Sequence, residues 1–134
     1  MIKNPKILLI DDDHDFVKAT SHILRTRQYQ IIVASNGEEG IRKMREDKPD
    51  LILLDIMMPG KSGYDVAYEI SKDPDFSDIP VLALTSIIES LGEPPFAFKV
   101  TEYLQKTIKP NDLLEKIEKY LKPNKPESSR GVFP

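Results

Sequence analysis

Short apolar runs alternate along the chain with longer stretches in which apolar residues recur every three or four positions. The runs are Ile7–Ile10, Ile31–Ala34, Leu51–Leu54, Val81–Leu84 and a weaker Tyr103–Leu104. Because these runs are continuously apolar and do not alternate with polar residues, they predict strands that are covered on both faces.

Helical periods follow the first three runs and the last, and each opens at a residue typical of a helix start. The caps Asp13, Asn36 and Ser62 precede the first three helices, and Pro110 opens the last one. The spacing in the first helix predicts one buried face, made by Phe16, Ala19, Thr20, Ile23 and Leu24. Alternating strands and helices of this kind are typical of a parallel sheet with helices on both sides.

The predicted architecture is therefore an α/β fold, a flavodoxin-like doubly wound five-stranded parallel sheet of strand order 2-1-3-4-5. Residues 86–100 break the pattern with Gly92 and Pro94–Pro95, so a fourth helix there is expected to be short or irregular. We predict one domain over residues 1–121. Residues 122–134 carry three prolines and no apolar period, which predicts a flexible tail.

Composition narrows the possible functions. The chain of 134 residues has 19 Lys and Arg against 22 Asp and Glu, a net charge of −3, and no Cys. Disulfides and thiolate metal sites are therefore excluded, and the acidic balance gives no bulk attraction to nucleic acid. No run approaches the roughly 20 apolar residues of a membrane helix. We expect a cytoplasmic protein without membrane insertion.

Chemically active side chains follow the apolar runs. Asp11–Asp13, Asp55, Thr85 and Lys106 each stand at or just after the end of a run, and these ends meet at one edge of a parallel sheet. Crowded carboxylates either take up a proton or bind a cation, and oxygen ligands without His or Cys favour Mg²⁺. The alternative is that the three consecutive acids only cap a helix, where acidic residues are favoured.

Four segments in order resemble the receiver domain of bacterial response regulators. They are Ile10–Asp12, Leu54–Gly63, Leu84–Ser86 and Tyr103–Lys106. The resemblance runs from Lys6 to about Leu121, and its most specific part is Asp55 to Gly63.

The resemblance implies a role for each matching residue. Asp55 is the expected phosphoacceptor, and Lys106 and Thr85 are expected to contact the phosphoryl group. Tyr103 is the expected aromatic switch. The expected Mg²⁺ ligands are Asp12, Asp55, the backbone carbonyl of Met57 and, through a water, Asp11.

As a stand-alone receiver, the chain is expected to take a phosphoryl group from a sensor histidine kinase or a histidine phosphotransfer protein. It would then change its binding to an unknown downstream protein, acting as a regulator and not as a conventional enzyme. The main alternative is a non-phosphorylated interaction scaffold of the same fold. A flavodoxin-like cofactor binder and a haloacid dehalogenase-type phosphatase fit less well, because the acidic loop repels phosphate and Met57 stands where the phosphatase needs Asp.

Two departures from the family pattern affect these expectations. Thr107 follows Lys106 where the family usually has proline after a cis bond, and because a cis bond costs far more without proline, we expect a trans bond. Residues 86–100 replace the usual fourth helix with a proline-containing segment, which predicts an altered partner surface. Met57 and Met58 are expected to pack against the neighbouring helix.

Overall fold

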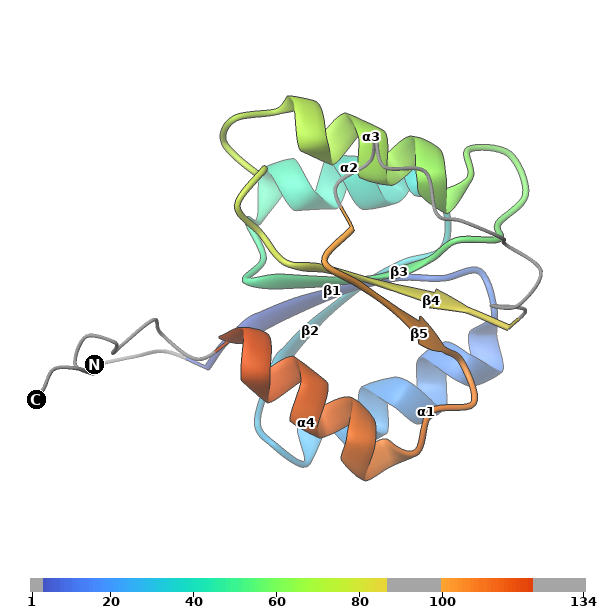
Figure 1. The fold of residues 1–134 in the computed structure, drawn as a ribbon, viewed down its shortest axis with the longest axis vertical. Helices are drawn as coiled ribbons and strands as arrows, with labels where there is room; N and C mark the ends of the chain where they lie inside the picture. Colours follow the sequence, from blue (N-terminus) through green and yellow to red (C-terminus); the bar gives the residue numbers. More distant parts are fainter. Residues whose placement is uncertain (1–3, 87–99, 122–134) are drawn as a thin grey trace, which may run out of the picture.

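The computed structural model describes residues 4–86 and 100–121. Its core is a parallel sheet of five strands in the predicted order β2-β1-β3-β4-β5 (Figure 1). The strands are β1 (Lys6–Ile10), β2 (Gln30–Ala34), β3 (Leu51–Asp55), β4 (Val81–Thr85) and β5 (Glu102–Gln105). The helices are α1 (His14–Arg25), α2 (Gly37–Glu46), α3 (Gly63–Lys72) and α4 (Pro110–Leu121).

The sheet is covered on both faces, which explains the continuously apolar runs. Helices α2 and α3 lie on one side of it and α1 and α4 on the other (Figure 1). Alternate residues of each strand therefore enter two separate apolar clusters: Leu8 and Ile52 pack on the α2–α3 side, and Leu9 and Leu53 on the α1–α4 side. Every residue of the central strand β3 and of its neighbour β4 is buried, so packing on both faces holds the strands that carry Asp55 and Thr85.

The predicted helix starts are confirmed. Asp13 accepts hydrogen bonds from two backbone N–H groups of the first turn of α1. Asn36 accepts one from the Glu39 N–H at 2.8 Å, and Ser62 forms a reciprocal capping box with Asp65. Caps of this kind satisfy N–H groups that have no partner inside the helix, so the sequence determines locally where these helices begin.

Two packing predictions are wrong. Ala19 is exposed, because the buried stripe of α1 is centred on Thr20 and Leu24 and leaves Ala19 on the other side of the helix. Met57 is 52% exposed, whereas Met58 is buried as predicted. The Ile56 N–H still donates to the Leu84 carbonyl of β4 and Ile56 is fully buried, so the chain leaves the sheet at Met57, whose side chain lies outside the core.

The Asn36 cap is expected to contribute measurably to the stability of the folded protein. We expect Asn36→Ala to lower the free energy of unfolding by about 1 kcal/mol, because the Glu39 N–H loses its acceptor. Urea denaturation followed by circular dichroism measures the change. Asn36→Ser keeps a capping oxygen and is expected to stay within about 0.5 kcal/mol of the wild type. Equal losses in both variants would contradict this role for the side chain.

Three predictions concern residues outside those that the structure describes. The irregular fourth helix and the altered partner surface fall on residues 87–99, and the tail falls on residues 122–134. Within residues 4–86 and 100–121, no helix combines the length and apolar character needed to cross a membrane.

Candidate functional site

Strand register brings the predicted site residues to one edge of the sheet. Ile10 pairs with Leu54 at the ends of β1 and β3, so Asp11 and Asp55 follow side by side. Asp55 in turn pairs with Leu84 of β4, which places Thr85 one residue further along the same edge. The site is thus a direct consequence of parallel pairing among the strands that carry it.

Three carboxylates gather at this edge. One oxygen from each of Asp11, Asp12 and Asp55 lies within 4.8 Å of the others. Asp11 and Asp55 are 1% and 3% exposed, whereas Asp12 is exposed. The Oδ2 atom of Asp11 is buried and lies 2.8 Å from the ammonium group of Lys106. A group of three carboxylates that offers only oxygen donors, two of its members buried, fits a hard divalent cation such as Mg²⁺.

The pKa of the Asp55 carboxyl is well above the usual value for aspartate. Burial raises its pKa, and the neighbouring Asp11 raises it further, to about 7. Lys106 and the Met57 N–H, which donates to Oδ1 at 3.1 Å, act in the opposite direction. Without a cation, Asp55 therefore retains its proton to a much higher pH than an ordinary aspartate does.

Lys106 reaches this group from the loop after β5. Its Nζ lies 2.8 Å from Oδ2 and 3.1 Å from Oδ1 of Asp11, and 3.6 Å from Oδ2 of Asp55. Burial lowers the pKa of the ammonium group, but the bond to Asp11 and the nearby carboxylates outweigh it, and the pKa is raised overall. Lys106 is therefore positively charged here. The bond to Thr107 is trans, as expected, like every described peptide bond.

The two predicted switch residues stand on the neighbouring strands β4 and β5. Thr85 is fully buried at the end of β4, and its carbonyl accepts from the Lys106 N–H at 2.8 Å. Tyr103 pairs with Ala83 inside the sheet, and its hydroxyl is buried. Burial raises the pKa of Tyr103, and the nearby Tyr64 of α3 raises it further. The phenol thus points into the protein, toward α3.

Sequence reasoning missed one neighbour of the site. The Lys106 ammonium lies 4.6 Å from the ring centroid of Phe16. The sequence assigned Phe16 only to the buried face of the first helix. Its place in the first turn of the helix that follows Asp11–Asp13 was the available signal, because that turn borders the carboxyl edge of the sheet.

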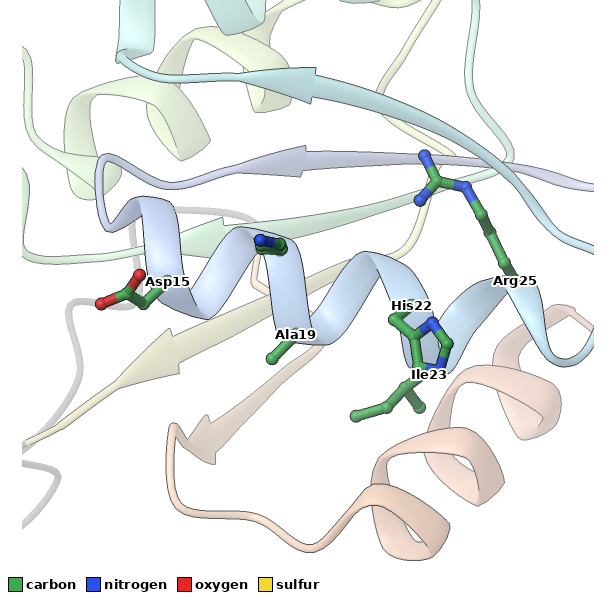
Figure 2. A pocket seen from close by; sticks show the side chains of 6 residues that line it. Asp15, Ala19, His22, Ile23 and Arg25 are labelled. Atoms are coloured by element: carbon green, nitrogen blue, oxygen red, sulfur yellow. The ribbon is translucent and has the colours of Figure 1, made fainter.

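A groove of about 650 Å³ runs along the outer side of α1 (Figure 2). It is lined by Asp15, Lys18, Ala19, His22, Ile23 and Arg25. The groove contains none of the predicted site residues, so it is separate from the acidic edge. It also accounts for the exposure of Ala19, which Figure 2 shows on its wall.

Comparison with known proteins agrees with this geometry. A family model described as the response regulator receiver domain matches residues 7–118. The chain is 31% identical over 126 residues to the DNA-binding response regulator MtrA of Mycolicibacterium smegmatis, covering 91% of this chain and 53% of MtrA. It is 35% identical over 81 residues to PilH of Pseudomonas aeruginosa, covering 60% of this chain and 67% of PilH.

A solved structure is similar along almost its whole length. The response regulator TrrA of Thermotoga maritima, in complex with Mg²⁺ and BeF, superposes with a TM-score of 0.78 at 34% identity. The alignment covers 87% of this chain and 99% of TrrA. The chain belongs to the response regulator receiver domain family of two-component signalling. It spans about half the length of several curated relatives that it matches.

Proposed function

We propose that the protein is a phosphoacceptor regulator that receives a phosphoryl group on Asp55 and then changes its binding to a downstream protein. The donor is a phosphohistidine, carried by a sensor histidine kinase or a histidine phosphotransfer protein. The observation that carries the proposal is the meeting of a buried carboxylate, two further carboxylates and a lysine ammonium within a few ångströms. We place this chemistry in the cytoplasm, where no membrane insertion is needed.

The proposed Mg²⁺ ligands are those that the resemblance to receiver domains implies. Asp12 and Asp55 would hold Mg²⁺ directly with the Met57 carbonyl, and Asp11 would hold it through a water. The ion, when bound, supplies positive charge that offsets the charge of the transferred group. The exposed position of Asp12 supports this assignment, because it leaves the acidic group open on one side.

The transfer step makes one bond and breaks one. A carboxylate oxygen of Asp55 bonds to phosphorus as the bond from phosphorus to the histidine nitrogen breaks, and its electron pair stays on the imidazole. Asp55 must be ionised to attack, so loss of its proton precedes the step. Lys106 is close enough to Asp55, at 3.6 Å, to neutralise phosphoryl oxygens as they arrive.

The response to phosphorylation would run through Thr85 and Tyr103. A phosphoryl group adds about −1.5 to −2 charges at neutral pH if it behaves like other phosphorylated side chains. Thr85 would donate its hydroxyl to that group, and Tyr103 would occupy the space beside it. The buried side chain of Thr85 and the buried hydroxyl of the half-buried Tyr103 support a change between two packed states, which is how a local charge can alter a distant surface.

Acetyl phosphate tests the proposal without a kinase. We expect the purified protein to gain the mass of one phosphoryl group when incubated with acetyl phosphate and Mg²⁺, because the small donor replaces phosphohistidine. Hydroxylamine is expected to remove the group, since acyl phosphates react with it, and EDTA is expected to prevent its formation. Intact-mass spectrometry measures all three results. A protein that gains no labile group under these conditions would instead be an interaction scaffold.

A further inference from the structure

The Lys106 ammonium lies between two unlike surfaces. On one side are the carboxylates of Asp11 and Asp55, and on the other is the ring of Phe16 at 4.6 Å. The Lys106 side chain is only 14% exposed, so few of its contacts are with water. A cation over the face of an aromatic ring is attracted by the ring electrons, more strongly where water is excluded.

The position of the Phe16 ring is fixed by its surroundings. The residue lies in the first turn of α1, whose start is fixed by the Asp13 cap, and Asp13 accepts directly from the Phe16 N–H at 3.1 Å. Its side chain packs against the apolar cluster on the α1–α4 side of the sheet. Lys106, in contrast, follows a short strand and carries a long flexible stem. The ring therefore restrains the more mobile partner.

We propose that Phe16 is a positioning residue for phosphoryl transfer, holding the Lys106 ammonium beside Asp55 through its ring face. This inference rests on the proposed function. Asp11 is the main partner of Lys106 here, yet it also belongs to the acidic group that would hold Mg²⁺. Any cation that draws on Asp11 weakens its hold on Lys106. The contact with Phe16 does not depend on the acids, so it keeps the ammonium at the site when Asp11 is engaged.

Two substitutions distinguish the effect of the aromatic ring from the effect of a large apolar side chain. Phe16→Leu keeps an apolar side chain but removes the ring, whereas Phe16→Tyr keeps the ring. With acetyl phosphate and Mg²⁺, we expect Phe16→Leu to slow the initial rate of phosphoryl adduct formation about five-fold, the effect of a partly desolvated cation–π contact. Phe16→Tyr is expected to stay within about two-fold of the wild type. The Mg²⁺ concentration for half-maximal rate is expected to be the same in all three proteins.

A direct readout of the contact needs neither metal nor phosphoryl donor. In the metal-free wild type, ring currents are expected to move the Lys106 ε-methylene proton resonances upfield in NMR spectra. Phe16→Leu is expected to remove this displacement, and Phe16→Tyr to retain it. Undisplaced resonances in the wild type would overturn the proposal, and so would an unchanged rate in Phe16→Leu or a slow rate in Phe16→Tyr.

The neighbouring Val17 provides the matched control. It packs against the same apolar cluster, and Val17→Ala is expected to lower stability while leaving both the Lys106 resonances and the adduct rate unchanged. A rate loss in Val17→Ala equal to that in Phe16→Leu would overturn the proposal, because general loosening of α1 would then explain both. If the wild type forms no adduct, the proposed function fails, and the Lys106 resonances still decide whether Phe16 holds the ammonium.

Discussion

Asp55→Asn is expected to abolish the hydroxylamine-labile phosphoryl adduct completely. The amide has no ionised oxygen to attack phosphorus, and Asp55 is the one carboxylate of the group that we propose as the acceptor. Intact-mass spectrometry after incubation with acetyl phosphate and Mg²⁺ measures the loss. Asp78→Asn is the matched control, because it makes the same chemical change at an exposed position. An adduct that persists in Asp55→Asn would place the phosphoacceptor elsewhere.

The same substitution is expected to stabilise the metal-free protein at alkaline pH. Burial and Asp11 raise the pKa of Asp55 to about 7 in the folded protein, from 3.8. The folded state therefore binds this proton more tightly than the unfolded chain does. Stability contributed by the group is complete below pH 4 and is lost as the pH rises toward 7. Asn cannot titrate, so Asp55→Asn does not undergo this loss.

The difference in free energy of unfolding between Asp55→Asn and the wild type isolates the contribution of Asp55, because the other titrating groups are the same in both proteins. We expect Asp55→Asn to exceed the wild type by about 2 kcal/mol in free energy of unfolding at pH 8, and by far less at pH 4.5. Urea denaturation at both pH values, with EDTA present, gives the comparison. Mg²⁺ is expected to narrow the gap at pH 8, because it binds the ionised wild-type group and stabilises the folded state. If the difference in free energy of unfolding between the two proteins did not depend on pH, the pKa of Asp55 would not be raised in the folded protein.

Local signals account for the part of the fold that the sequence predicts. Continuous apolar runs require cover on both faces, and the caps at Asp13, Asn36 and Ser62 act within one helical turn. The site positions could be predicted for a related reason. Strand ends converge in any parallel sheet, so a polar residue at the end of an apolar run already has a place in space.

Contacts between distant parts of the chain could not be predicted in the same way. Phe16 and Lys106 meet only because α1 and the loop after β5 border the same edge of the sheet. The local sequence around either residue does not indicate this contact. The protonation of Asp55 also depends on burial and on the approach of Asp11. Ala19 was misassigned because helical spacing alone does not fix the centre of the buried stripe.

Gly63→Ala is expected to destabilise the protein severely. A β-carbon at Gly63 would lie 2.3 Å from the backbone oxygen of Asp55 and 2.5 Å from the Cα of Ile56. Both are backbone atoms at the end of a buried strand, so they cannot move aside as a flexible side chain can. The Gly63 N–H also donates to the Ile56 carbonyl at 3.0 Å, which closes the loop directly after Asp55. We expect a loss of about 3 kcal/mol or more in free energy of unfolding.

Gly60→Ala in the same loop provides the comparison. Gly60 has a φ of +74° but open space around its missing side chain, so alanine meets only the left-handed backbone penalty of about 1 kcal/mol. Urea denaturation gives the free energy of unfolding of both variants. Gly63→Ala reports the steric clash with the strand, and Gly60→Ala reports the backbone strain alone. Gly63→Ala is also expected to slow adduct formation, since the clash displaces the Asp55 backbone itself. Comparable stabilities for the two variants would mean that α3 can move away from β3, and that the loop does not fix the acceptor.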